Sequence, residues 1–331
     1  MDFSTFPKIE LHLHLDCSLS YEVVQKLAPY VSFEEYRRDF IAPPKCTDLA
    51  DYITRAIKGF ELMQTEEQLR LVTLDLFQQL KQDGVVYAEI RFAPLQHVFQ
   101  GLTATEVVTI VDAAVGEGIR ATGLEGRLLL CTLRHFKEAQ SMETVQLVEA
   151  FRNRYVVGFD IAADEAGFPI DEHKSAFNYA RSKGIPCTAH AGEAKGAESV
   201  WETLEHFTPT RIGHGVRSAE DPNLLVHLKA KDIHLEVCPT SNVQTNVFPS
   251  LKEHTATTIY DAGVSMSINT DARAISDTTL GKEYDIMLEE FKWTIDHLKH
   301  CNFEALRHCF APETLKEEIK AKLNSAYRHW I

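Results

Sequence analysis

The chain has 331 residues, of which 44% are hydrophobic and 25% are charged, a composition typical of a folded globular protein and not of a disordered one. Its formal net charge of −14 disfavours nucleic acid and anionic membrane surfaces as partners, because their phosphates would be repelled. No run approaches the roughly 18 apolar residues of a membrane span, and no signal peptide opens the sequence, so we expect a cytoplasmic protein with a small-molecule substrate. The seven cysteines form no CxxC pair, which predicts reduced thiols and no cysteine-only zinc site.

Short apolar or β-branched runs alternate along the whole chain with segments of helical period. The eight runs are 8–16, 84–94, 125–135, 156–165, 186–193, 211–215, 233–242 and 265–273. Strands separated by helices need crossover connections, so this alternation predicts a parallel sheet covered by helices.

The segments between these runs carry helix start and stop signals. Thr65 and Gln68 have the spacing of a capping box, and Gly84 follows that helix as a stop. Thr103 and Glu106 repeat the box, and a helix is expected to open at Asp221-Pro222.

Eight βα units in one chain favour a closed, TIM-type (β/α)8 barrel, because an open nucleotide-binding sheet would carry a glycine-rich phosphate loop and none occurs. No linker or repeat divides the chain, so we expect a single domain over residues 1–331. Residues 17–83 form a long helical insertion between the first two strands and are a candidate lid over the barrel mouth. The sequence predicts nothing about oligomeric state.

Polar residues interrupt the first strand at its carboxyl end, where a barrel of this type builds its active site. His12, His14 and Asp16 alternate along that strand, so all three side chains are expected on its inner side. Two imidazoles spaced in this way can converge on one metal ion, and neutral nitrogen donors suit zinc.

Three later strands also end in ionisable residues: His190 and Glu193 follow the fifth strand, His214 the sixth and Asp271 the eighth. Three histidines and a carboxylate predict a mixed nitrogen and oxygen site that lowers the pKa of a bound water to roughly 7 and supplies hydroxide. Glu193 and His214 remain for proton transfer.

Each element taken alone has an ordinary structural interpretation. An isolated HxH pair occurs in polar clusters, Asp271 alone resembles a helix cap, and His214 alone resembles a hydrogen-bonded core histidine. The segment 238–242 fits a turn as well as a site. Their joint position at four strand ends favours the functional interpretation, because unpaired buried polar groups are costly. The remaining histidines are expected to be structural: His97, His135, His173, His234 and His254.

Six segments, taken in order, resemble the adenosine deaminase family. They are KIELHLHLD at 8–16, GFDIAADE at 158–165, HAGE at 190–193, IGHG at 212–215, CPTSN at 238–242 and SINTD at 267–271. The resemblance implies hydrolytic deamination of adenosine and 2′-deoxyadenosine to inosine and ammonia, a step of purine salvage, with one Zn²⁺ per chain.

Carried over residue by residue, the resemblance implies roles for the polar residues already singled out. The zinc ligands are His12, His14, His190 and Asp271, and Asp271 also takes part in catalysis and faces the substrate. Glu193 gives a proton to purine N1, His214 orients and activates the water, and Asp16 contacts the ribose. The backbone N–H of Ala163 meets purine N3.

Three positions depart from the family pattern. Ala163 replaces a frequent glycine, Cys17 stands where HLDGS is frequent, and Ala272 replaces a polar residue that bonds purine N7 in many members. Arg273 is a candidate to compensate for Ala272. Free adenine, an N6-substituted AMP or another adenosine-like metabolite therefore stay open as substrates, and so does a catalytically silent binding protein with a deaminase-like pocket.

Overall fold

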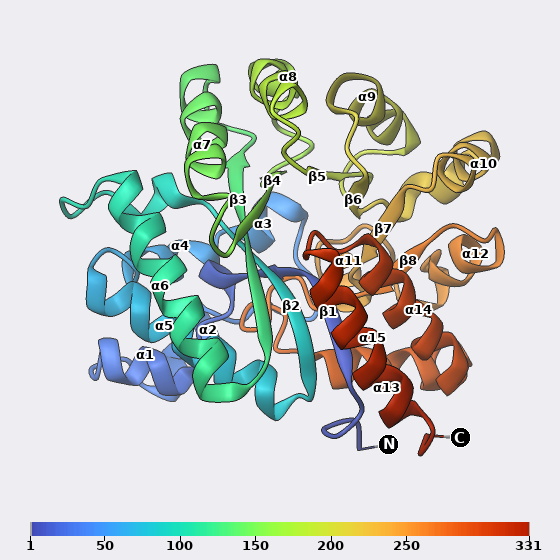
Figure 1. Cartoon of the computed structure of the whole chain (residues 1–331), viewed down its shortest axis with the longest axis horizontal. Coiled ribbons are helices and arrows are strands. Elements are labelled where there is room, and N and C mark those ends of the chain that lie inside the picture. The colour runs from blue at the N-terminus through green and yellow to red at the C-terminus, as the bar shows by residue number, and fades with distance from the viewer. Residues whose placement is uncertain (1, 331) are drawn as a thin grey trace.

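The computed structural model describes residues 2–330, in which eight parallel strands form the centre of the molecule (Figure 1). The strands are β1 (Lys8–His14), β2 (Val85–Phe92), β3 (Glu125–Leu133), β4 (Val156–Ala162), β5 (Thr188–Ala191), β6 (Arg211–His214), β7 (His234–Val237) and β8 (Met266–Ile268). Each lies within one of the eight predicted runs, which confirms the βα alternation.

The strands close into a barrel. Hydrogen-bonded neighbours follow chain order in two arcs, β1 to β4 and β5 to β8. One junction between the arcs is a bridge between Leu13 and Asp271, and the other is a bridge between Phe159 and Cys187. The predicted (β/α)8 barrel is therefore confirmed, and the carboxyl ends of all eight strands lie at one mouth.

Helices surround this barrel, and α7, α8, α9, α10 and α12 fan outward from it in Figure 1. The fifteen α-helices of the described residues are α1 (Tyr21–Leu27), α2 (Phe33–Asp39), α3 (Leu49–Ile53), α4 (Ala56–Glu61), α5 (Glu66–Gln82), α6 (Ala104–Thr122), α7 (Glu138–Phe151), α8 (Lys174–Ser182), α9 (Ala197–Phe207), α10 (Pro222–Ala230), α11 (Pro239–Gln244), α12 (Ala256–Asp261), α13 (Leu280–Glu289), α14 (Ile295–His308) and α15 (Glu313–Tyr327). None of the helices in residues 2–330 is long and apolar enough to cross a membrane.

The residues predicted to begin helices form helix caps in the structure. Capping boxes formed by Thr65 with Gln68 and by Thr103 with Glu106 begin α5 and α6, and the side chain of Asp221 caps α10. The apolar stripe of α5 is buried against the barrel, and its members Leu69, Val72, Leu76 and Leu80 are at most 1% exposed. The main core thus lies between the strands and the surrounding helices.

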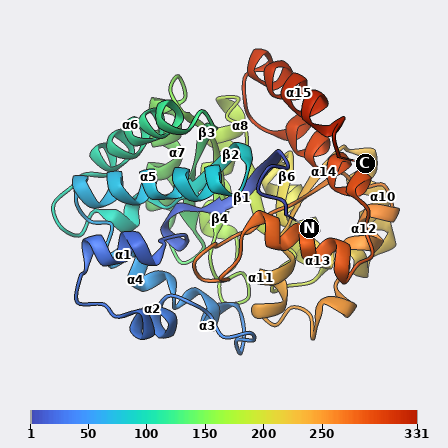
Figure 2. The same ribbon diagram turned by 90° about the horizontal axis from the view of Figure 1, so that it is seen from below.

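The long connection between β1 and β2 consists of five helices. Its last helix, α5, packs against α6 as an ordinary crossover helix, so α1 to α4 are the added part. These four helices lie together on one side of the barrel in Figure 2. Backbone hydrogen bonds of 2.8 Å tie the segment to the barrel mouth, from Ala42 N to Ile275 O and from Cys46 N to Gln244 O. Movement of this segment as a lid stays a prediction.

Candidate active site

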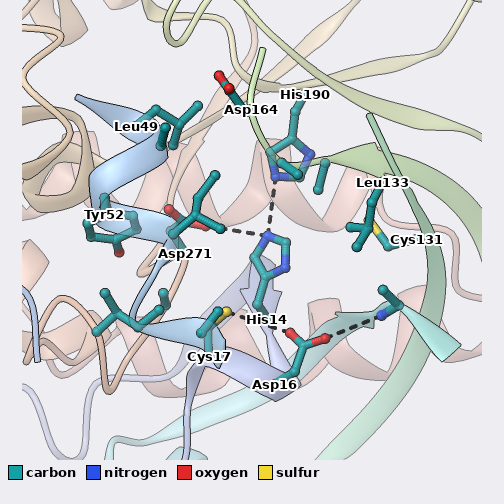
Figure 3. A pocket seen from close by; sticks show the side chains of 18 of the residues that line it. His14, Asp16, Cys17, Leu49, Tyr52, Cys131, Leu133, Asp164, His190 and Asp271 are labelled. Carbon is teal, nitrogen blue, oxygen red and sulfur yellow. Dashed lines mark hydrogen bonds and ion pairs between the residues drawn. The ribbon is translucent and has the colours of Figure 1, made fainter. Parts of the chain in front are cut away.

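Five of the predicted residues meet at the carboxyl ends of β1, β5, β6 and β8. The ligand atoms of His12, His190, His214 and Asp271 all lie within 4.8 Å of one another. His14 joins them, because its Nε2 lies 3.2 Å from His190 Nε2 and 3.5 Å from Asp271 Oδ1 (Figure 3). The strand ends therefore assemble one cluster of four imidazoles and one carboxylate.

Three residues of the site have left-handed backbone conformations that side chains other than glycine rarely adopt. The φ angles are 80° at Ala163, 60° at His214 and 64° at Asp271. Such conformations cost about 1–3 kcal/mol each and persist only where the surrounding structure enforces them. The positive φ at Ala163 also explains why glycine suits this position in the family pattern.

Buried carboxylates orient two of the histidines. His12 Nδ1 donates to Glu236 Oε2 at 2.8 Å, and His190 Nδ1 donates to Asp160 Oδ1 at 3.2 Å. With the ring proton on Nδ1, each Nε2 lone pair faces the cluster. His12 Nε2 is buried and has no hydrogen-bond partner of its own. An orphaned nitrogen beside a carboxylate and further imidazoles fits a divalent metal such as zinc.

A single arginine joins the two orienting carboxylates. Arg91 donates to Glu236 Oε2 and to Asp160 Oδ2, at 2.7 Å in both cases, and all three side chains are fully buried. The other oxygen of Glu236 accepts from Arg211 Nε at 2.7 Å, and the Arg211 guanidinium lies 3.9 Å above the ring of Phe310. A stack of buried charges thus extends from the cluster to the opposite end of the barrel.

The segment after β7 holds two other members of the cluster. Ser241 Oγ donates to Asp271 Oδ2 at 2.6 Å, and Asn242 Nδ2 donates to His214 Nδ1 at 3.0 Å. Because His214 Nδ1 accepts, the neutral ring carries its proton on Nε2, which lies 3.5 Å from Glu193 Oε2. Of the two interpretations of segment 238–242, the structure supports the functional one.

Glu193 lies in a buried and negatively charged environment. It is 4% exposed, and one of its oxygens has no hydrogen-bond partner. Burial raises the pKa of Glu193 well above its ordinary value, and the negative charge of Asp271 raises it further. A raised pKa favours the protonated form of the carboxyl group, which is the form that a general acid needs.

The loop that carries Glu193 is held by another carboxylate, that of Glu165. Its two oxygens accept the backbone N–H groups of Gly192, Glu193, Ala194 and Lys195, at distances of 2.6–3.0 Å. Successive N–H groups converging on one carboxylate fix a loop strongly, since such charge-assisted bonds are about twice as strong as neutral ones.

We therefore expect Glu165→Gln to lower kcat, because an amide cannot accept from all four N–H groups and Glu193 loses its fixed position. Steady-state ammonia release measures the effect, with Glu318→Gln on the exposed surface as the matched control. Equal rates for the two variants would show that the Glu165 carboxylate does not position Glu193.

The cluster forms the floor of a cavity of about 220 Å³. Residues of the added helices and of the strand ends line it, among them Asp16, Leu49, Tyr52, Ala163 and Ala272 (Figure 3). A second hollow beside α4 adjoins this cavity, because Phe60 and Gln96 line both. The site is thus a deep and largely apolar pocket with its polar groups at the bottom.

Asp16 and Ala163 line this cavity, as expected for substrate-facing residues. Asp16 Oδ2 accepts from Ala93 N at 3.3 Å and lies 3.7 Å from His97 Nε2. His97 and the cavity-lining His135 therefore belong to the surroundings of the site, although sequence reasoning assigned both to the structural group. By contrast, His173 and His234 make buried hydrogen bonds away from the cluster, as a structural role requires.

Arg273 does not replace the polar residue missing at position 272. Its guanidinium turns away from the cavity and pairs with Asp83 Oδ2 at 2.9 Å and Glu10 Oε2 at 3.3 Å. Sequence reasoning also missed that Asp160, Glu236 and Arg91 orient the histidines of the cluster. The available signal was a charged residue inside a strand predicted to be buried on both faces.

Comparison with known proteins adds independent information on the family. The family model described as adenosine deaminase matches residues 7–326. The chain belongs to the adenosine deaminase family. It is 37% identical to the adenosine deaminase of Enterococcus faecalis, with 97% of each chain covered, and 36% identical to that of Mycobacterium marinum, with 96% of this chain and 95% of the relative covered.

Solved structures share the fold of this adenosine deaminase family member. An adenine deaminase from Arthrobacter aurescens superposes with a TM-score of 0.89 at 24% identity, covering 97% of this chain and 99% of the other. The N6-methyl-AMP deaminase of Arabidopsis thaliana gives a TM-score of 0.86 at 23% identity, covering 98% of both chains. Proteins named for different 6-aminopurines thus share this barrel.

Proposed function

We propose that the protein hydrolyses the 6-amino group of a purine nucleoside, with adenosine and 2′-deoxyadenosine as substrates and inosine or 2′-deoxyinosine and ammonia as products. The observation that carries this proposal is a buried Glu193 with a raised pKa, beside the histidine and aspartate cluster at the floor of the pocket. Family membership and the adenosine deaminases to which the chain is 36–37% identical support the same activity.

The hydrogen bonds at Nδ1 of His12, His190 and His214 support different roles for the histidines. His12, His14, His190 and Asp271 would hold one zinc ion, since their free Nε2 and Oδ1 atoms converge. When bound, the ion supplies a Lewis acid that makes hydroxide available near neutral pH. His214 stays outside this ligand set, because Asn242 directs its ring proton to Nε2.

The remaining polar residues act on the substrate and the attacking water. Glu193 donates its proton to purine N1, which makes C6 electrophilic, and His214 orients the water for attack on C6. Asp16 contacts the ribose, and the Ala163 backbone N–H approaches purine N3. The C6–O bond forms, the C6–N bond breaks, and ammonia leaves.

The charges near the cavity favour a nucleoside over a nucleotide. Lysine and arginine are absent from the described residues that line it, so a phosphate finds no cation there. Arg91 and Arg273 are paired with buried carboxylates, and Arg217 donates to Glu220 Oε1 at 2.7 Å. Arg91, Arg217 and Arg273 are thus already occupied.

Ammonia release from zinc-loaded protein tests the proposal across adenosine, 2′-deoxyadenosine, adenine, AMP and N6-methyl-AMP. We expect both nucleosides to be turned over with a kcat/KM at least tenfold above that of either nucleotide. If adenine or a nucleotide is preferred, the substrate assignment changes, whereas the assigned reaction, hydrolytic deamination, stays the same. Release from none of them, with metal bound, would favour the binding-protein alternative.

Removal of the metal is expected to abolish turnover and to lower thermal stability. A ligand present at 100 times its Kd stabilises the folded protein by about 2.7 kcal/mol, so dialysis against a zinc chelator lowers Tm accordingly. Calorimetry and ammonia release before and after dialysis measure both effects, and added Zn²⁺ should restore them together. Full activity of the metal-free protein would rule out the zinc assignment.

A further inference from the structure

The order of strands around the barrel determines which wall faces each edge of a bound base. In a closed ring of eight strands, β1 lies opposite β5. Glu193 follows β5, whereas Cys17 follows β1 and Ala272 follows β8, so the last two stand across the mouth from Glu193. N1 and N7 of a purine lie on opposite sides of C6. A base with N1 at Glu193 and C6 at the cluster therefore turns its N7 edge toward Cys17 and Ala272.

The wall on that side is apolar and closely packed. Cys17, Leu49, Tyr52, Ala272 and Ile275 line the cavity there. All but Cys17 belong to a small apolar cluster separate from the main core, and Cys17 packs against it. Ala272 is 2% exposed, so its methyl group is a fixed part of this surface. Leu49 and Tyr52 come from α3, which covers the wall from the side of the added helices (Figure 3).

The polar side-chain atoms of this wall are engaged with other groups. Tyr52 OH shares a 2.6 Å hydrogen bond with Ser276 Oγ, and Cys17 Sγ is directed at Asp16 Oδ1, at 3.7 Å. Arg273 is paired with Asp83 and Glu10 on the far side of its backbone. Of the five wall residues, Leu49, Ala272 and Ile275 carry no donor, and the polar groups of Tyr52 and Cys17 already face other partners.

This wall treats a nitrogen and a carbon at ring position 7 differently. N7 is an acceptor that loses its hydrogen bond to water on entering the pocket and gains none from the wall. A C–H group at the same position loses no hydrogen bond. A purine base therefore gains no hydrogen bond at this wall that would make it bind more tightly than its analogue with C–H at position 7.

We propose that the protein also deaminates 7-deazaadenine nucleosides, in which C–H replaces N7, and that Ala272 is the residue that admits them. The inference rests on the proposed function, because it assumes the same reaction in the same pocket. Water supplies hydroxide to C6 and a proton to the leaving amine, the C6–N bond breaks, and 7-deazainosine and ammonia result. Position 7 forms and breaks no bond in this reaction.

Kinetics of ammonia release with adenosine and 7-deazaadenosine test the proposal directly. We expect measurable turnover of both, with a KM for 7-deazaadenosine no higher than that for adenosine. A KM more than about tenfold higher, the value of one lost hydrogen bond, would overturn the inference. Ammonia from adenosine alone would overturn only this inference, whereas ammonia from neither nucleoside would overturn the proposed function as well.

A variant pair separates the wall from the electronic difference between the two rings. Ala272→Asn places an amide donor toward position 7, and Ala272→Leu adds a similar volume without a donor. We expect the ratio of kcat/KM for adenosine to that for 7-deazaadenosine to rise about tenfold in Ala272→Asn and to stay at the wild-type value in Ala272→Leu. The electronic difference is the same for each protein, so it cancels in this comparison. An unchanged ratio in Ala272→Asn would overturn the assignment of Ala272.

Discussion

Glu193→Gln is expected to lower kcat for adenosine by a factor of about 10²–10⁴ and to leave the zinc content at one ion per chain. Glutamine has the size of glutamate and forms hydrogen bonds, but it has no acidic proton to give to N1. Since Glu193 is buried and outside the proposed ligand set, the substitution removes proton transfer without dismantling the cluster. Steady-state ammonia release and elemental analysis measure the two quantities on the same sample.

The matched control for Glu193→Gln is Glu205→Gln, which removes an exposed carboxylate from nearby α9. It should keep wild-type kcat and metal content. Retention of full turnover by Glu193→Gln would show that another group protonates the base. Loss of zinc by Glu193→Gln would instead place this carboxylate among the metal ligands.

Arg91→Met is expected to cause the largest loss of stability, about 3–5 kcal/mol, because it leaves Glu236 and Asp160 buried without their shared cation. It is also expected to weaken zinc binding by about 10–100-fold, since both carboxylates orient histidines of the cluster. Urea unfolding of the metal-free protein measures the first effect, and competition with a chromogenic chelator measures the second.

Arg70→Met provides the comparison, because Arg70 pairs with Glu117 on the exposed surface. It should leave the unfolding midpoint and the zinc Kd unchanged. If Arg91→Met is too unstable to purify, Glu236→Gln keeps the side-chain shape and still removes the charge that orients His12. Wild-type zinc affinity in both variants would exclude a role for the buried charges in holding the metal ligands.

Much of the fold and the centre of the site followed from local sequence patterns. Each strand lies within a short run predicted from the sequence, and the helices between the strands have capping residues that the structure reproduces at Thr65, Thr103 and Asp221. The residues of the cluster were predictable because ionisable side chains at the ends of apolar strands have few other stable positions.

The remaining features depend on contacts between segments far apart in the chain. The left-handed backbone at His214 and Asp271 could not be predicted, because neither position is a glycine and the surrounding structure enforces the conformation. Arg273 was an open candidate for the substrate side, but pairing with Glu10 and Asp83 draws it away. Nor does local sequence relate Arg91 to Glu236, which lies 145 residues further along the chain.

The placement of Phe310 over Arg211 has a consequence for the carboxyl-terminal part of the chain. The aromatic ring, in the turn between α14 and α15, covers Arg211, which belongs to the stack of buried charges that ends at His12. It therefore helps to keep water away from Arg211, and exclusion of water keeps the local dielectric constant low. The turn between the last two helices thus affects the electrostatic environment of the buried charges from the end of the barrel opposite the cavity.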